Sequence, residues 1–361
     1  MRVLLCALLV LCAAVAAPIS NAVTGRTPST RTITFPARGL GKYYIEDARR
    51  SFLSQWPAFA KRSIAKGRVS VPADASIAVE TYFCNHDCLP DLRFLRPNDI
   101  QTLDVDGSIL KHSSFKYISR LTGLKTLTLD GTDTDDKDIE FLSVGMPSLQ
   151  TLNLGYTKIT DRALVSISKM KSIKALSFQN NAVTPVGLKS IVQNSTLCEL
   201  DLKDTALGDD AIRVLSKARS LSVLNLAKTK ITDQGLLSLR SLRSIRKLDL
   251  SGTCVTDAAV ANSISRLENL EELNLSGTRI TDAGVAQLSK LKNLKKLWLR
   301  DLKKVSDSSV PALISLTNLV DLELQKTNIT AKGVQLIAKA LPESEVHSKA
   351  LCSCRTRTRV N

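Results

Sequence analysis

The chain has 361 residues and a formal net charge of +16 at pH 7, and its length would suffice for two or three ordinary domains. It contains three histidines, His86, His112 and His347, each in a different setting and none beside a plausible Ser or Cys nucleophile with an orienting acid, as hydrolytic catalysis requires. The sequence also lacks a glycine-rich phosphate loop and a histidine pair at helical spacing. We therefore expect no enzymatic activity, no cofactor and no metal site.

Residues 1–22 have the organisation of a secretory signal peptide. A charged start, Met1-Arg2-Val3, precedes an apolar run from Leu4 to Ala16, and either Ala14-Val15-Ala16 or Ser20-Asn21-Ala22 would suit cleavage. The run is too short to span a bilayer comfortably, and nothing later in the chain is apolar enough to do so. The sequence therefore predicts a protein that is secreted or held outside the cytosol, including at the cell surface, with no transmembrane segment.

Residues 23–98 differ in character, and we expect them to form a small β-rich module. Apolar and polar residues alternate, as in half-buried strands, in four stretches: Thr32–Pro36, Leu40–Ile45, Gly67–Ala73 and Ser76–Tyr82. The intervening residues Ala48–Ala60 predict a short helix or a loop.

Residues 99–342 consist of about ten copies of one unit. The first apolar residues of the copies are Ile100, Leu124, Leu149, Ile173, Leu197, Leu221, Ile245, Leu270, Leu294 and Leu319, at a spacing of 24 or 25 residues. Within a copy, Leu273 and Leu275 are two positions apart, as on a half-buried strand, whereas Val285 and Leu288 are three apart, as on one face of a helix. Each copy therefore predicts a strand, a turn and a helix.

A single copy is too thin to have a core of its own. Stacking of neighbouring copies supplies the core, so the object grows as a curved rod whose ends need covering. The module at 23–98 would cap the first copy. The segment 343–361, which follows Leu341-Pro342, is polar and basic, and we expect it to be a disordered tail.

Two polar positions recur within the copies. A hydroxyl follows the strand, and we expect it to satisfy buried backbone groups, with Asn181 doing so in one copy; the hydroxyls belong to Thr157, Thr205, Thr229, Thr253, Thr278 and Thr327. Next comes Ile-Thr-Asp, as in Ile280-Thr281-Asp282, where both polar residues are candidates for the helix N-cap and the Asp is interpreted as a cap. In one copy Leu302-Lys303-Lys304-Val305 lengthens the turn and removes the hydroxyl.

The pattern L-x-x-L-x-L-x-x-T-x-I-T-D-x-G-L/V-x-x-L resembles leucine-rich repeats of secreted bacterial and protist proteins, and also the cysteine-containing repeats of F-box proteins. Both groups share a ribonuclease-inhibitor-like horseshoe, so the resemblance implies an α/β solenoid with a curved parallel sheet on the concave face and helices on the convex face. The F-box resemblance implies a substrate adaptor of a ubiquitin ligase.

One side chain per strand, between the two buried leucines, should face the concave side. We call these residues the central column: Asp104, Thr128, Asn153, Ser177, Asp201, Asn225, Asp249, Asn274, Trp298 and Glu323. Trp298 interrupts a polar strip and has charged neighbours, the make-up of a binding hot spot. The alternative is that its ring packs on the stems of Lys296 and Arg300. The predicted ligand-binding residues are Trp298, Lys296, Arg300, Glu272, Asn274, Glu323, Asp249 and Asn225.

Much of the positive charge falls where each helix leads into the next strand. We call this set the basic edge: Lys169, Lys171, Lys174, Lys217, Arg219, Arg240, Arg243, Arg246, Lys290, Lys292 and Lys295. One explanation of this placement is that positive side chains are stabilised at helix C-termini by the helix dipole. The other explanation is that the basic edge binds an anionic surface. Nucleic acid is disfavoured as a partner, because secretion would separate it from the protein and aromatic stacking residues are scarce.

Two cysteines, Cys84 and Cys88, precede the first copy and could form a disulfide in an oxidising compartment. The alternative is a pair of free thiols. The run Cys84-Asn85-His86-Asp87-Cys88 could also offer zinc ligands, but structural zinc sites usually draw on two separated segments.

These patterns together predict a secreted, non-catalytic protein that recognises a protein or glycan through its concave face. The alternatives are an adaptor of an F-box-type ubiquitin ligase and a purely structural surface protein.

Overall fold

The structure is a computed structural model that describes residues 29–37, 39–45, 63–81, 87 and 89–348. The predicted signal peptide, the segment Ala48–Ala60, the cysteines Cys84 and Cys88 and the arginines near the C-terminus lie outside these residues.

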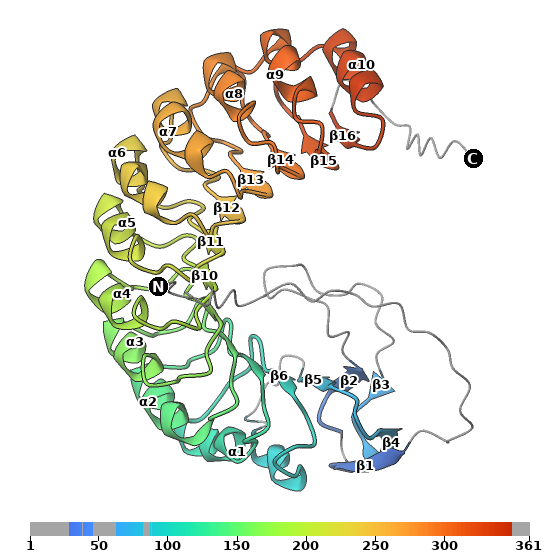
Figure 1. The fold of residues 1–361 in the computed structure, drawn as a ribbon. Coiled ribbons are helices and arrows are strands. Elements are labelled where there is room, and N and C mark those ends of the chain that lie inside the picture. The colour runs from blue at the N-terminus through green and yellow to red at the C-terminus, as the bar shows by residue number, and fades with distance from the viewer. Residues whose placement is uncertain (1–28, 38, 46–62, 82–86, 88, 349–361) are drawn as a thin grey trace, which may run out of the picture.

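The repeated copies wind into an open arc with strands along its inner side and helices along its outer side (Figure 1). The predicted α/β solenoid is therefore confirmed. The strands are β1 (Thr30–Phe35), β2 (Lys42–Ile45), β3 (Ser63–Ile64), β4 (Gly67–Pro72), β5 (Ile77–Glu80), β6 (Thr102–Asp104), β7 (Thr126–Thr128), β8 (Thr151–Asn153), β9 (Ala175–Ser177), β10 (Glu199–Asp201), β11 (Val223–Asn225), β12 (Lys247–Asp249), β13 (Glu272–Asn274), β14 (Lys296–Trp298), β15 (Asp321–Glu323) and β16 (Glu345–His347).

The outer side is built from short helices, most of them one to two turns long. The α-helices are α1 (Phe115–Ser119), α2 (Asp136–Gly145), α3 (Asp161–Ile167), α4 (Pro185–Ile191), α5 (Asp209–Leu215), α6 (Asp233–Leu236), α7 (Asp257–Asn262), α8 (Asp282–Leu288), α9 (Val310–Ile314) and α10 (Ala331–Ala340). Five 3₁₀ segments lie among them in the described chain: η1 (Leu89–Phe94), η2 (His112–Ser114), η3 (Leu237–Ser241), η4 (Ile264–Arg266) and η5 (Asp307–Ser309).

One sheet of 14 strands runs through the described chain in the order β16 to β5, then β2 and β3. It is parallel from β5 to β16, and β2 pairs antiparallel with both β5 and β3. Each step pairs equivalent positions of neighbouring copies: Leu273 of β13, for example, lies opposite Leu248 and Leu297. The repeat period read from the sequence is therefore also the register of the sheet.

The N-terminal module contains the four predicted strands as β1, β2, β4 and β5, together with the short β3. β1 and β4 form a separate antiparallel pair. Side chains tie β1 to the last residues of the module, just before the first copy, because Arg31 donates to the carbonyl of Asn98 at 2.9 Å and Arg96 donates to that of Thr32 at 2.6 Å. Since β5 is already parallel to β6, the parallel part of the sheet begins at Ile77.

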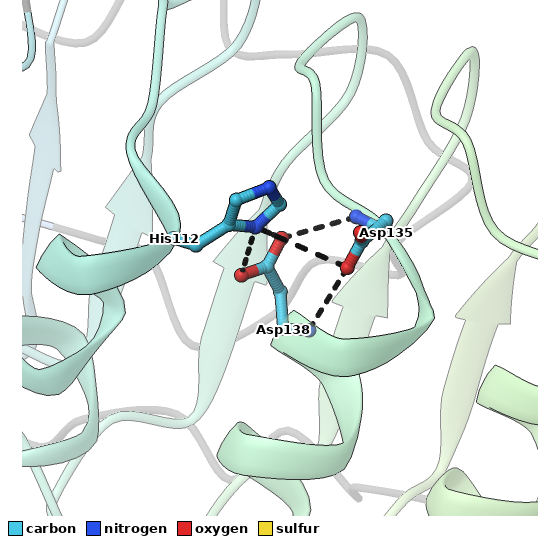
Figure 2. A group of neighbouring side chains, drawn as sticks. All are labelled: His112, Asp135 and Asp138. Atoms are coloured by element: carbon cyan, nitrogen blue, oxygen red, sulfur yellow. Dashed lines mark hydrogen bonds and ion pairs between the residues drawn. The ribbon is translucent and has the colours of Figure 1, made fainter.

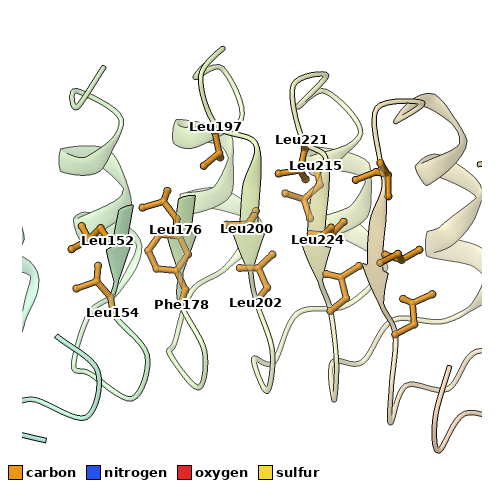
Figure 3. Close-up of a cluster of buried hydrophobic side chains, with 14 of the residues drawn as sticks. Leu152, Leu154, Leu176, Phe178, Leu197, Leu200, Leu202, Leu215, Leu221 and Leu224 are labelled. Atoms are coloured by element: carbon orange, nitrogen blue, oxygen red, sulfur yellow. The ribbon is translucent and has the colours of Figure 1, made fainter. Parts of the chain in front are cut away.

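A continuous apolar core runs from Ile33 in the module to Leu341 in the last copy. The first apolar residue of every predicted copy is buried, and the strand leucines lie behind the sheet in successive layers, as in Leu176, Leu200 and Leu224 (Figure 3). Replacing one such leucine by alanine typically costs about 2–5 kcal/mol. Stability is therefore spread along the arc rather than concentrated at one centre.

The predicted role of the turn hydroxyls is confirmed. Each donates to the backbone carbonyl three residues earlier at 2.6–2.8 Å, as Thr278 does to Leu275. Asn181 differs because its amide reaches the Leu154 carbonyl of the preceding copy, at 2.6 Å. In the lengthened turn, buried Leu302 stands where the hydroxyl would be.

The interpretation of the Asp in Ile-Thr-Asp as a cap was wrong. The preceding Thr is the N-cap, and the Asp is the first helical residue. Its carboxylate accepts two hydrogen bonds from the cap residue of the next copy, from the backbone nitrogen at 2.7–2.8 Å and from the hydroxyl at 2.5–2.7 Å. We call this contact a carboxylate rung. It is formed by Asp136, Asp161, Asp209, Asp233, Asp257, Asp282 and Asp307.

The carboxylate rung is missing between α4 and α5. Pro185 stands where the Asp would be, and Gly208 stands where the capping Thr would be. A shallow cleft of about 320 Å³ opens between these residues. This step therefore lacks the two hydrogen bonds between copies that a carboxylate rung provides.

The sheet extends beyond the predicted end of the repeats. β16 pairs in parallel with β15, so the expectation of disorder from residue 343 onward was wrong for Glu345–His347. A strand forms there because the open edge of β15 offers unpaired backbone groups to the chain that returns from α10.

Candidate ligand-binding surface

The central column is aligned across the sheet as the repeat spacing predicts. Asp249 lies opposite Asn274, Asn274 opposite Trp298, and Trp298 opposite Glu323. β16 adds His347 to the end of the column. At about 4.8 Å per strand, the ten predicted positions make a surface roughly 45 Å long.

Several members of the column also hold the turn that follows their strand. The side-chain oxygen of Asn274 accepts from the backbone nitrogen of Ser276 at 3.0 Å, and Asn225 and Asp249 make the same contact with the residue two positions on, at 3.0 and 2.8 Å. Such a bond is an Asx turn. Asn and Asp recur in this strip for a structural reason, and they remain partly exposed to a ligand.

Trp298 lies partly buried among side chains that pair with one another. Glu272 receives ion pairs from both sides, from Lys247 at 3.1 Å and from Lys296 at 3.3 Å. Arg300 lies 3.9 Å from Glu323. The charged residues predicted around the ring are therefore brought together and largely neutralise one another.

The remaining predicted residues lie further along the same face. Asn274 donates to Asp249 at 3.0 Å, which links β13 to β12. Asn225 lies on β11, three strands from Trp298, and so can contact only a ligand that spans several strands.

The carboxylates near the N-terminal end of the column are less acidic than usual. The pKa of Asp104 is raised to about 7, mainly by burial and also by the neighbouring carboxylates of Asp106, Glu80 and Asp130, against a backbone hydrogen bond that lowers it. Burial likewise raises the pKa of Asp201 to about 6. The strip therefore carries less negative charge near neutral pH than its composition suggests.

The basic edge is exposed along the arc, apart from the partly buried Arg240. Near its C-terminal end Glu271 offsets some of its charge, pairing with Arg246 at 2.5 Å and with Lys295 at 2.7 Å.

His112 forms a cluster with Asp135 and Asp138 that sequence reasoning missed (Figure 2). The Nδ1 atom of His112 lies 2.8 Å from one carboxylate oxygen of Asp138 and 2.9 Å from the other. His112 begins η2, at the position where later copies carry the Asp of the carboxylate rung, and the acids here stand on the next copy instead. The cluster is thus a rung in which the hydrogen-bond donor and acceptor are exchanged between the two copies.

The hydrogen bond that His112 donates to the Asp138 carboxylate raises the pKa of His112 above its ordinary value of 6.5. Asp135 and Asp138 also form the capping box of α2. Both carboxylates therefore already have a structural role in capping α2.

A second mixed cluster, also missed, lies at the C-terminal end of the concave face. Asp321, Glu323 and His347 each bring one ligand atom within 4.8 Å of the others. Sequence reasoning placed His347 in a disordered tail and so gave no reason to join it to the column. The signal that could have found it is Glu345-Val346-His347, a last apolar alternation 24 residues after Asp321-Leu322-Glu323.

The cysteines inside the copies, Cys198 and Cys254, carry thiol groups. Cys84 and Cys88 lie outside the described residues, so their disulfide stays a prediction. None of the helices in the described part of the chain has the length and hydropathy needed to span a bilayer.

A family model described as a leucine-rich repeat region matches residues 77–344. The chain is a leucine-rich repeat protein. The match begins at the first residue of β5, where the parallel part of the sheet begins. Leucine-rich repeat proteins, like other solenoids, offer extended concave surfaces for binding.

Solved structures of other leucine-rich repeat proteins resemble this one. An internalin (inlF) of Listeria monocytogenes is 20% identical over 69% of this chain and 74% of its own, with a TM-score of 0.52. A leucine-rich repeat protein of Leptospira interrogans is 22% identical over 69% of this chain and 72% of its own, with a TM-score of 0.46. At 20% identity the likeness to the internalin shows the fold alone. No curated protein sequence matches this leucine-rich repeat protein.

Proposed function

We propose that this leucine-rich repeat protein is a secreted, non-catalytic binding protein that recognises a protein ligand through its concave face. A glycan is the alternative ligand. The observation that carries the proposal is the setting of Trp298, a partly exposed aromatic ring at the centre of a rim of paired charges.

The pairing of the rim favours binding. Lys296 is already held by Glu272, and Arg300 by Gln325 at 2.7 Å and by Glu323. Side chains that are ordered beforehand lose less conformational entropy when a ligand arrives. An aromatic anchor inside a polar rim is also the usual composition of an interface hot spot.

The binding experiment uses the full chain as a probe against a panel of purified secreted proteins and a glycan array, followed by titration calorimetry on each ligand found. We expect Trp298→Ala to weaken binding about tenfold or more. Phe141→Ala is the matched control, because this aromatic on α2 is 50% exposed on the convex side. Equal affinities of wild type and Trp298→Ala for every ligand would reject the concave site.

Secretion is tested by fractionating cells that express the native gene and sequencing the N-terminus of the product. A start near Ala17 or Val23 outside the cytosol would support the proposal. An intact Met1 in the cytosol would instead favour the ubiquitin-ligase adaptor. A secreted product that binds nothing would favour a structural surface protein.

The basic edge supports a second candidate function, attachment to an anionic surface. Its exposed lysines and arginines follow one side of the arc, where their fields add. Retention on immobilised heparin should fall with rising salt and should weaken in Lys171→Glu/Arg243→Glu. Unchanged retention of the double variant would remove this candidate.

A further inference from the structure

The cluster at the C-terminal end of the sheet contains three side chains with the chemistry of metal ligands. Asp321 and Glu323 lie two positions apart on β15, so both face the concave side. His347 on β16 lies opposite Glu323. One atom from each of the three lies within 4.8 Å of the others.

Two oxygen atoms of this cluster have no hydrogen-bond partner among the described residues. They are Oδ1 of Asp321 and Oε2 of Glu323, and both are shielded from solvent. The Nε2 atom of His347 lies 3.8 Å from the first, and Nε of Arg300 lies 3.9 Å from the second, beyond hydrogen-bonding distance in each case. Buried carboxylate oxygens normally have a hydrogen-bond donor or a cation as a partner, so the absence of one at these two atoms needs an explanation.

The cluster around His112 provides a comparison within the same chain. It also contains one histidine and two acids, but its carboxylates accept hydrogen bonds from His112 and from the backbone of α2. No oxygen of Asp135 or Asp138 is left buried without a partner. The two clusters thus have the same composition, but only the C-terminal one has buried carboxylate oxygens without a hydrogen-bond partner among the described residues.

We propose that Asp321, Glu323 and His347 bind a divalent transition-metal ion, for which zinc is the probe. One imidazole and two carboxylates suit such an ion. Ligands at about 2.0–2.2 Å from tetrahedral zinc are roughly 3.3–3.5 Å apart, so the 3.8 Å between His347 and Asp321 needs little adjustment. The ion gives both buried oxygens a partner.

The bound ion has two consequences for the structure. It fastens β16, the last strand, to β15, because its ligands come from both. Three protein ligands also leave coordination positions open on the concave side, where Glu323 is the neighbour of Trp298. The metal site and the proposed ligand surface are therefore adjacent, but the metal site does not depend on that function.

The test is calorimetric titration of zinc into the full chain, prepared without a histidine tag. We expect one site in the wild type whose affinity falls at least about tenfold in both His347→Ala and Glu323→Gln, whereas the matched control His112→Ala keeps it. Because thiolates are also zinc ligands, the series is repeated in a Cys84→Ser/Cys88→Ser background, where the same site should persist.

A second readout is thermal unfolding. Zinc should raise the Tm of the wild type and of His112→Ala but not that of His347→Ala. A wild type that binds no zinc, or a zinc site equally strong in His347→Ala and Glu323→Gln, would overturn the proposal. Circular dichroism confirms that each variant is folded before titration.

Discussion

Asp257, the first residue of α7, accepts two hydrogen bonds from Thr281 of the next copy, one from its backbone nitrogen and one from its hydroxyl, each at 2.7 Å. The hydroxyl of Thr281 also accepts from the backbone of Ala283 at 3.2 Å and so caps α8. One carboxylate thereby fixes the start of the next helix and the distance between copies. Inter-copy geometry is set by these rungs as well as by the apolar core.

Removing one rung should destabilise the solenoid. We expect Asp257→Ala to lower the free energy of unfolding by about 1–3 kcal/mol, because it leaves two partly buried donors of Thr281 without their charged acceptor. Urea unfolding followed by circular dichroism measures the change. Asp210→Ala is the control, since within the described part of the chain Asp210 makes only an exposed pair with Arg213 at 2.6 Å, and the substitution should change stability by about 0.5 kcal/mol or less. Equal losses in the two variants would contradict the role of the rung.

Adding a carboxylate rung between α4 and α5, where it is missing, should stabilise the protein. Gly208 already has the extended backbone of the other N-caps, and a Cβ placed there meets no atom closer than 3.9 Å. In a double-mutant cycle, we expect the gain in free energy of unfolding of Pro185→Asp/Gly208→Thr to exceed the summed effects of the two single variants by about 1 kcal/mol. Additive single effects would show that the two side chains do not meet.

The exchanged rung at His112 should make stability depend on pH. Because the pKa of His112 is raised in the folded state, its contribution is full below the ordinary value of 6.5 and is lost as pH rises through the raised value. The side chain of His112 is 66% exposed, so solvent screens its interaction with Asp138. We therefore expect the free energy of unfolding of wild type to exceed that of His112→Gln by about 0.5–1 kcal/mol at pH 5.5. Urea unfolding at pH 5.5 and 9 tests this. An advantage of the same size at both pH values would contradict it.

Asp104 should also make stability fall as pH rises, but over a lower pH range, because burial disfavours its ionised form. Its pKa is about 7 in the folded state against an ordinary 3.8, so wild type loses stability as pH rises from about 4 through 7. Asn153, at the aligned position two strands away, makes the same turn hydrogen bond that Asp104 makes to Asp106. Asp104→Asn should therefore be more stable than wild type at pH 8 by on the order of 1–3 kcal/mol, with the difference shrinking toward pH 4. A constant difference across this range would argue against burial as the cause.

The candidate site could be predicted from the sequence in part. The strand period placed Trp298 between Asn274 and Glu323, because equivalent residues of stacked copies must pair in a parallel sheet. The ion pairs around the ring depend on side-chain directions across three strands, which no local pattern encodes. For the same reason the cluster of Asp321, Glu323 and His347 was missed, since His347 reaches Asp321 only when β16 pairs with β15.

The sequence by itself determined the unit, its period, the buried leucines and the turn hydroxyls, because each of these rests on contacts within one copy or on strict repetition of the same contact. Tertiary structure decided which polar residues act across copies. In the sequence Asp257 looks like a helix cap and Asp104 like a strand residue on the concave face. In the structure Asp257 bonds to the next copy, and Asp104 loses acidity through burial and its acidic neighbours. The physical reason is that stacking sets the distances between copies and removes water from between them, and both quantities exist only once the copies have assembled.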